Sequence, residues 1–305
     1  APRAPRGAAR ASNRGVGKRR VFTAAAAGLL VATTVGLVAS WVVGGRLVAS
    51  VARGPGSLRM PASLGGEPIA LASASGATLA GWHVRAEPSR GAVVLLHGVR
   101  GTRLAMVERA RWLRDAGYSS VLIDFQAHGE STGERITFGD LERHDASAAV
   151  DFARAAHPGE GVAVIGVSLG GAAALLASPL GIDALVLESV YPDVASAVHN
   201  RVRMRLGALS ALPAALLLAQ LGPRLGVAPA QLRPIDRVAD AGCPLLVLSG
   251  RADRHTTEEE TRALFERARE PKELWLVDGV GHVDLHAVGR AAYEARVLDF
   301  LVRHL

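Results

Sequence analysis

The sequence contains very little cysteine and few aromatic residues. Cys243 is its single cysteine, and phenylalanine, tryptophan and tyrosine together make up only 4 % of the 305 residues. One cysteine forms neither an intrachain disulfide nor a cysteine-based zinc site. Cys243 stands in Ala-Gly-Cys-Pro before an apolar run, which predicts a small buried residue rather than a reactive thiol. The hydrophobic fraction of 49 % excludes wholesale disorder and must build its core from alanine, valine and leucine.

Acidic residues are absent from the first twenty positions. This segment carries seven of the chain's 35 basic residues, and the remaining 28 match its 28 acidic residues. The net charge of +7 therefore belongs to the tail alone, and the body is formally neutral. A neutral body gives no basis for nucleic-acid binding, so no nucleic-acid partner is expected. The tail is rich in arginine, alanine and glycine, and we expect residues 1–20 to be disordered.

Charged residues are also absent from residues 21–43. At about 1.5 Å per residue, a helix of this length reaches roughly 35 Å, which is enough to span a bilayer. The excess of basic residues before it predicts a cytoplasmic amino terminus and an extracytoplasmic body. The alternative is a signal peptide cleaved near residues 38–40 or 48–50, which would release a secreted protein. An uncleaved anchor is favoured because the apolar cores of signal peptides are usually shorter.

The body alternates strand-like and helix-like segments after a linker at residues 44–60. This alternation predicts an α/β fold with a mostly parallel sheet, whose ligands bind beyond the carboxyl ends of the strands. We expect strands at 69–73, 78–85, 92–96, 120–125, 161–167, 184–188, 244–249 and 274–277. Helices are expected at 106–116, 136–156, 168–177, 257–269 and 288–305.

Residues 191–240 interrupt the alternation inside the predicted domain of residues 61–305. This insertion contains a basic stretch followed by the apolar residues 206–221. We expect a helical cap whose leucines, Leu216, Leu217, Leu218 and Leu221, pack on the sheet. Two alternatives are an apolar lid for acyl chains and a second surface that contacts the membrane.

The sequence Gly166-Val167-Ser168-Leu169-Gly170 lies between a predicted strand and a predicted helix. Gly-x-Ser-x-Gly at such a junction is typical of a strained turn that exposes the serine hydroxyl at a helix amino terminus. The motif is short, and its structural context is what favours chemistry over a plain glycine turn. Ser168 is therefore the candidate nucleophile.

A serine nucleophile needs a base to accept its proton. His282 follows the last predicted strand and precedes the final helix, so it should lie at the same edge of the sheet as Ser168. His286, one helical turn further on, is the rival candidate. The two histidines could also bind a metal, but the segment between them lacks the glutamate of the zinc-protease motif, and no metal is expected.

The base in turn needs a carboxylate that fixes its tautomer. Asp253 follows the predicted strand at residues 244–249 and leaves the same edge of the sheet, which makes it the preferred acid. Glu188 ends its own strand and is the alternative acid. The backbone amides of Val99, in the loop after the first core strand, and Leu169, next to the nucleophile, are the candidate oxyanion donors.

The order Ser168, Asp253, His282, with His97-Gly98 upstream, resembles that of the α/β-hydrolase superfamily. Residues 124–131, Asp-Phe-Gln-Ala-His-Gly-Glu-Ser, are similar to its Asp-x-x-x-His-Gly-x-Ser loop, and Pro234-Ile235-Asp236 precedes the acid-bearing strand as in relatives. The resemblance covers residues 65–305 and is nearest to monoacylglycerol-lipase-like, dienelactone-hydrolase-like and prolyl-oligopeptidase-like serine hydrolases. Gln126-Ala127 replaces the arginine and glycine of many relatives, and we expect this departure to alter the loop near the site.

The resemblance implies a serine hydrolase that needs neither a metal nor an organic cofactor. Together with the apolar amino-terminal segment, it predicts a membrane-anchored enzyme that cleaves carboxylic esters, of a lipid or a small molecule, through an acyl-enzyme. A serine peptidase or amidase and an acyltransferase are alternatives on the same triad. A hydrolase fold that binds without catalysis is the third alternative.

Overall fold

The computed structural model describes residues 13–305 and divides them between two compact units that meet after Arg46. The first unit consists of helix α1 (Asn13–Val48), whose last two residues belong to the second unit. Residues 13–20, expected to be disordered, are helical, as are residues 44–48 of the expected linker. The helix continues because no proline interrupts it, and it ends where Ala49 pairs with Arg135. Residues 1–12 of the predicted tail lie outside the described residues.

Two segments of the described chain are long and apolar enough to cross a membrane. The span Val21–Val48 has a mean hydropathy of 2.1, and none of its most apolar 18-residue window is buried, which makes α1 a candidate transmembrane span. The second segment, Val194–Leu225, has a mean hydropathy of 1.5, but it is broken into several short helices. A bilayer crossing needs about 20 continuous helical residues, so the second segment is better described as a cap.

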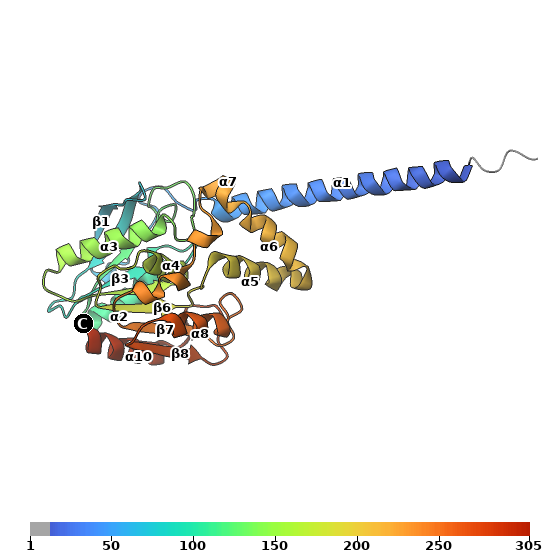
Figure 1. The fold of residues 1–305 in the computed structure, drawn as a ribbon. Coiled ribbons are helices and arrows are strands. Elements are labelled where there is room, and N and C mark those ends of the chain that lie inside the picture. The colour runs from blue at the N-terminus through green and yellow to red at the C-terminus, as the bar shows by residue number, and fades with distance from the viewer. Residues whose placement is uncertain (1–12) are drawn as a thin grey trace, which may run out of the picture. The chain divides into compact units, whose positions relative to one another are not determined.

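The second unit is built on an eight-stranded sheet (Figure 1). Its strand order is β1-β2-β4-β3-β5-β6-β7-β8, and β2 alone runs against the other strands, antiparallel to β1 and β4. Because strands β3 to β8 are parallel, their carboxyl ends share one edge, where ligands bind in such sheets. The strands are β1 Gly66–Ala72, β2 Thr78–Val84, β3 Ala92–Leu96, β4 Ser119–Ile123, β5 Val162–Val167, β6 Ala184–Glu188, β7 Leu245–Gly250 and β8 Lys272–Val277.

Helices cover both faces of the sheet and bury its apolar strands. Side chains of α2 and α10 form one core with the sheet, whereas those of α3, α4 and α8 form the core on the other face. The alanine-rich α3 and α4 approach closely, which suits a sequence poor in aromatic residues. The helices of this unit are α2 Val107–Asp115, α3 Glu142–Ala156, α4 Leu169–Leu176, α5 Val194–Leu206, α6 Ala211–Leu218, α7 Leu221–Leu225, α8 Glu258–Arg267, α9 Leu285–Val288 and α10 Arg290–His304.

The expected helix at 136–156 begins only at Glu142. The buried Glu142 carboxylate accepts hydrogen bonds from the amides of Thr137 and Gly139, and Ile136 N donates to Val48 O. These bonds hold residues 136–141 as an irregular loop, in which Phe138 and Gly139 have φ values of 56° and 112° that an α-helix does not contain. The expected final helix at 288–305 is present as α10, which begins at Arg290, and the short helix α9 precedes it.

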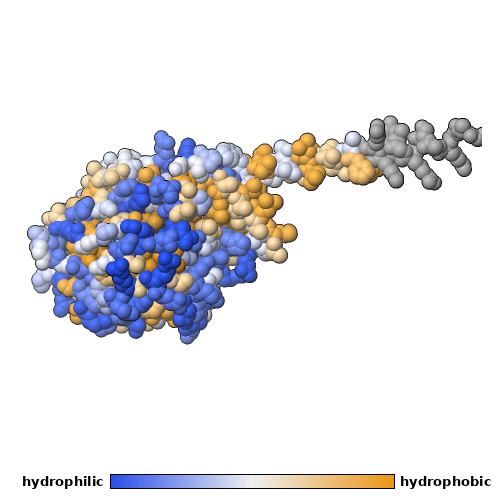
Figure 2. Space-filling view, in the orientation of Figure 1, coloured by the Kyte–Doolittle hydropathy of each residue, from blue (hydrophilic) through white to orange (hydrophobic). Residues whose placement is uncertain are grey.

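The cap consists of α5, α6 and α7 with short 3-10 turns. Leu221 is buried with Val194, Val227 and Leu232, and partly buried leucines of the cap pack against this cluster. Other cap residues face outward: Leu209 is 79 % exposed and Leu212 is 69 % exposed. Figure 2 shows apolar residues gathered on the surface of the cap around α6. The cluster includes no strand residue of the described chain, so the expectation that these leucines pack on the sheet is wrong. The cap buries part of its leucines in this separate cluster and exposes the rest.

Candidate active site

Ser168 lies in a strained turn between β5 and α4. Its φ of 50° and ψ of −107° are unusual for a residue with a side chain. The flanking glycines make this turn possible: a Cβ on Gly166 would lie 2.5 Å from Gly171 N, and one on Gly170 would lie 2.3 Å from Leu96 O. The sequence pattern thus has a steric cause. It fixes Ser168 at the N-cap of α4, at the carboxyl edge of the sheet.

Asp253 and His282 meet at this edge although 29 residues separate them. His282 Nδ1 lies 2.7 Å from Asp253 Oδ2, while Asp253 Oδ1 accepts the amides of His255 and Thr256. Burial opposes ionisation, but the bond from His282 and those from the two amides hold the pKa of Asp253 below its usual value. A carboxylate at Nδ1 stabilises the tautomer with its proton on that atom. His282 Nε2 is then the basic nitrogen.

A second histidine lies against His282. The rings of His255 and His282 stack with their centroids 4.8 Å apart and an interplanar angle of 19°. Burial, followed by the nearby Arg201, lowers the pKa of His255, which favours the neutral ring. Sequence reasoning missed His255. Its position two residues after the preferred acid was the available signal.

One pocket of about 360 Å³ collects these groups. Ser168 and His282 line it together with Gly98 and Val99, while Asp253 lies behind His282. The volume is within the range of small-molecule sites. The remaining lining residues are Ala105, Met106, Arg109, Val167, Ser189, Arg201, His255, Val283 and Asp284.

The two candidate oxyanion donors flank Ser168. Leu169 is the first residue of α4, and a Cβ on Gly98, next to Val99, would lie 3.7 Å from Ser168 Cβ. Within residues 13–305, neither the Val99 amide nor the Leu169 amide donates a hydrogen bond. Unengaged amides beside a nucleophile are the arrangement that stabilises a developing oxyanion.

Two buried histidines hold the loop that carries Val99. His97 Nδ1 lies 2.8 Å from Gly98 O, and its Nε2 accepts the Phe125 amide. His128 accepts the Arg100 amide in the same way. Burial, followed by the charge of His128, lowers the pKa of His97 to about 3, so the ring is neutral near pH 7. A neutral ring supplies the one donor and one acceptor that the loop requires.

Glu188, the alternative acid, is engaged elsewhere. Its carboxylate accepts Arg109 Nη2 at 2.7 Å and the Tyr293 hydroxyl, and all three side chains are buried. Arg109 also pairs with Asp284. Burial would lower the pKa of Arg109, but Glu188 and its other partners raise it well above its usual value. Glu188 therefore contacts a cation in the core and makes no hydrogen bond to His282.

His286, the rival base, is buried away from this pocket. Its Nε2 lies 2.8 Å from Glu294 Oε1, and its ring contacts those of Trp112 and Tyr293. Across the described residues, no group of three histidine, cysteine, aspartate or glutamate side chains is placed to hold a metal. The structure thus brings Ser168, His282 and Asp253 together and leaves His286 and Glu188 in other contacts.

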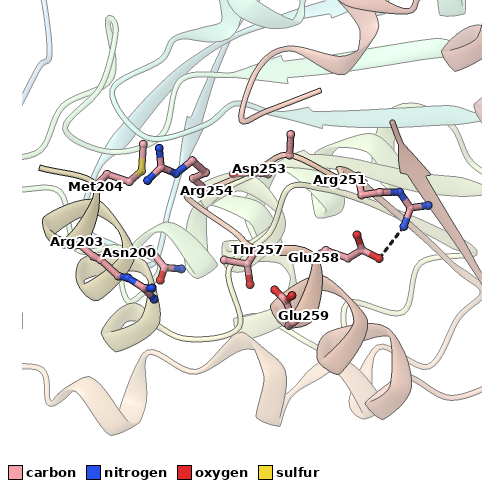
Figure 3. A pocket seen from close by; sticks show the side chains of 10 residues that line it. Asn200, Arg203, Met204, Arg251, Asp253, Arg254, Thr257, Glu258 and Glu259 are labelled. Carbon is pink, nitrogen blue, oxygen red and sulfur yellow. Dashed lines mark hydrogen bonds and ion pairs between the residues drawn. The ribbon is translucent and has the colours of Figure 1, made fainter. Parts of the chain in front are cut away.

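A second hollow, of about 350 Å³, opens between α5 and α8 beside the Asp253 loop (Figure 3). Neither Ser168 nor His282 lines it. Arg251, which lines it, pairs with Glu258. Asp253 lines this hollow, whereas Ser168 and His282 line the other pocket, so the bond between Asp253 and His282 runs between the two.

Comparison with known proteins shows the family to which this chain belongs. Residues 87–235 match the family model described as serine aminopeptidase, S33. The chain is 30 % identical over 288 residues to the uncharacterised protein Rv2307c of Mycobacterium tuberculosis, covering 88 % of this chain and 92 % of that one. It is also similar to the Pyrococcus furiosus esterase Pf2001, with a TM-score of 0.68, 24 % identity, and coverage of 84 % and 98 %. The chain belongs to the α/β-hydrolase superfamily.

Other relatives extend across bacteria. The uncharacterised protein YqkD of Bacillus subtilis is 24 % identical over 238 residues, covering 76 % of this chain and 77 % of YqkD. The structure of XC6422 from Xanthomonas campestris, titled a serine hydrolase without a lid, gives a TM-score of 0.54 at 19 % identity, with coverage of 81 % and 97 %. The match to the XC6422 structure supports the α/β-hydrolase fold.

Gln126, which replaces a residue found in many relatives in the loop of residues 124–131, makes specific contacts in this structure. Gln126 Nε2 donates to Glu142 Oε1 at 2.9 Å and to Arg135 O at 2.7 Å. The side chain thereby binds the irregular loop before α3 and does not line the pocket of Ser168.

Proposed function

We propose that this protein is a serine hydrolase that cleaves carboxylic esters through a covalent acyl-enzyme. The observation that supports it most is the 2.7 Å contact between Asp253 and His282, with His282 facing the same pocket as Ser168. A serine without an adjacent base is a poor nucleophile, and a histidine without a carboxylate is a poorly oriented base. The site offers all three groups.

The proposed reaction has two steps, acylation of Ser168 and hydrolysis of the acyl-enzyme, and the same groups act in both. Ser168 Oγ attacks the ester carbonyl carbon while His282 Nε2 accepts the hydroxyl proton, and Asp253 stabilises the resulting imidazolium. The Val99 and Leu169 amides bind the oxyanion of the tetrahedral intermediate. The imidazolium then protonates the departing alcohol. Water attacks the acyl-enzyme with its proton passing to His282, which returns it to Ser168 as the acid leaves.

Labelling with a fluorophosphonate probe tests this assignment on the full-length protein. We expect the wild type to be labelled and Ser168→Ala to lose the label. Ser189→Ala is the matched control, because Ser189 lines the same pocket and its buried Oγ has no hydrogen-bond partner. Labelling that persists in Ser168→Ala contradicts the proposal. An unlabelled wild type favours a hydrolase fold that only binds.

Two related activities share the same acyl-enzyme. The family model named serine aminopeptidase makes an aminoacyl amide the second candidate substrate class. Transfer to an alcohol instead of water would make the protein an acyltransferase. A panel of short esters, long-chain esters and aminoacyl amides, assayed with and without an added alcohol, distinguishes them by product. We expect free acid from esters as the dominant product.

We further propose that α1 anchors the enzyme in a membrane, with its amino terminus in the cytoplasm. Support comes from the long apolar span Val21–Val48 and from the seven basic residues that precede it. Extraction of membranes with alkaline carbonate should leave the protein in the pellet. Release into the soluble fraction contradicts an anchor and supports a cleaved signal peptide. Protease added to sealed spheroplasts should digest the catalytic domain if it is extracytoplasmic.

A further inference from the structure

Arg201 enters the catalytic pocket from the cap. It lies on α5 seven residues after Val194 and four after Ala197, both buried, so it continues the inward stripe of that helix. Its side chain lines the pocket of Ser168 and His282. Arg205, on the same helix, is exposed instead and lines no part of that pocket.

The Arg201 guanidinium forms no ion pair within the described part of the chain. Its one hydrogen bond there runs from Nη1 to Ala197 O at 2.9 Å. Arg109, the other arginine of the pocket, has two carboxylate partners, Glu188 and Asp284. The two arginines of one pocket therefore differ in charge compensation.

The acids nearest to Arg201 are already engaged. Asp253 accepts its bonds from His282 and from two loop amides, and Glu260 accepts the side-chain amide of Asn200 and the backbone amide of Thr257. Tyr191, which also faces Arg201, donates its hydroxyl to Phe138 O. Burial lowers the pKa of Arg201 while these acids oppose the change. An arginine in a protein stays protonated, so the pocket holds a partly dehydrated positive charge.

Such a charge is costly unless an anion compensates it, and a guanidinium binds a carboxylate through two parallel hydrogen bonds. Resting on the proposed esterase function, we propose that Arg201 binds a carboxylate carried by the substrate itself. The substrate class is then a small ester that bears a free carboxylate, such as a half-ester of a dicarboxylic acid. The pocket of about 360 Å³ admits a molecule of this size. The same charge disfavours the protonated amine of an aminopeptidase substrate.

Matched chromogenic esters test the inference. 4-Nitrophenyl hexanoate is the neutral reference, and mono(4-nitrophenyl) adipate has the same six-carbon acyl chain with a terminal carboxylate. The hexanoyl ester of 5-hydroxy-2-nitrobenzoate places the carboxylate on the leaving group instead. We expect the full-length wild type to prefer at least one charged ester over the reference by about tenfold or more in kcat/KM, because a hydrogen-bonded charge pair supports a preference of that order.

Variants then assign that preference to Arg201. Arg201→Gln should lower the charged-to-neutral ratio of kcat/KM by about ten- to a hundredfold, chiefly through KM, and Arg201→Lys should retain part of it. Arg205→Gln removes the same charge from the exposed face of α5, and it should leave the ratio unchanged.

Two results would overturn the inference. The first is a wild type without preference for either charged ester, which needs no variant. The second is an unchanged charged-to-neutral ratio in Arg201→Gln; if both esters lose kcat/KM equally, Arg201 is a positioning residue for His255 and His282. In both cases the wild type keeps its Ser168-dependent hydrolysis of the neutral ester. Loss of that hydrolysis in the wild type would overturn the proposed function as well.

Discussion

Strands β6 and β7 are neighbours in the sheet, and each brings a buried carboxylate to the same edge. The two carboxylates differ in the groups that bind them. Glu188, at the end of β6, is bound by Arg109 and Tyr293, whose side chains are fixed in the core. Asp253, just after β7, is bound by two loop amides and by His282, whose side chain is 22 % exposed. A strand end supplies the position, but the donors around a carboxylate decide whether its charge stabilises the fold or orients a base.

The largest effect is expected where the carboxylate orients the base. Asp253→Asn keeps the shape of the side chain but removes the charge that selects the His282 tautomer, so kcat/KM should fall by about 10⁴-fold. The measurement is ester hydrolysis by protein whose circular dichroism matches the wild type. Asp278→Asn, an exposed position in the neighbouring turn, is the control. A loss smaller than about tenfold would abolish the distinction between the two carboxylates.

The next effect concerns stability rather than turnover. Glu188→Gln leaves the buried Arg109 with only the partly exposed Asp284 as a carboxylate partner, and the loss of its buried counterion should lower the free energy of unfolding by about 3 kcal/mol. Urea denaturation measures it, with Glu108→Gln, at a partly exposed ion pair, as the matched control. If Glu188→Gln instead leaves stability intact and removes activity, Glu188 takes the role assigned to Asp253.

The smallest expected effect is also on stability, and it tests whether Glu188 serves the fold rather than catalysis. Tyr293→Phe removes the hydroxyl that donates to Glu188 and accepts from Arg109, and should lower the free energy of unfolding by about 1 kcal/mol. Ester hydrolysis by the folded variant should stay near the wild-type rate, because Tyr293 does not line the pocket of Ser168. A double-mutant cycle with Glu188→Gln should show non-additive losses. Additive losses would mean that the two side chains act independently.

Sequence patterns predicted what depends on order along the chain. The apolar strands, the glycines around Ser168 and the sites of Asp253 and His282 after successive strands all follow from local composition and from the shared edge of a parallel sheet. Sequence position favoured Asp253 over Glu188, but it did not predict what binds Glu188, because the partners of Glu188 come from positions 79 and 105 residues away.

Other features escaped prediction for the same reason. The loop at 136–141 reads as helix by composition, but the buried Glu142 carboxylate binds its amides. His255 lies against His282 only because a turn after β7 places it there. Arg201 stood in a basic stretch that gave no sign of which arginine turns inward, and the helical phase of α5 in the folded cap made that choice.

The single thiol of the chain has a practical consequence. Cys243 is partly buried, and burial, with the nearby Asp183, raises its pKa to about 12. Such a thiol has almost no thiolate at neutral pH and reacts slowly with maleimides. The natural protein should therefore give little background labelling with thiol reagents. A cysteine introduced at the exposed Leu209 could carry a fluorophore, and its emission would report the polarity around the cap when lipid vesicles are added.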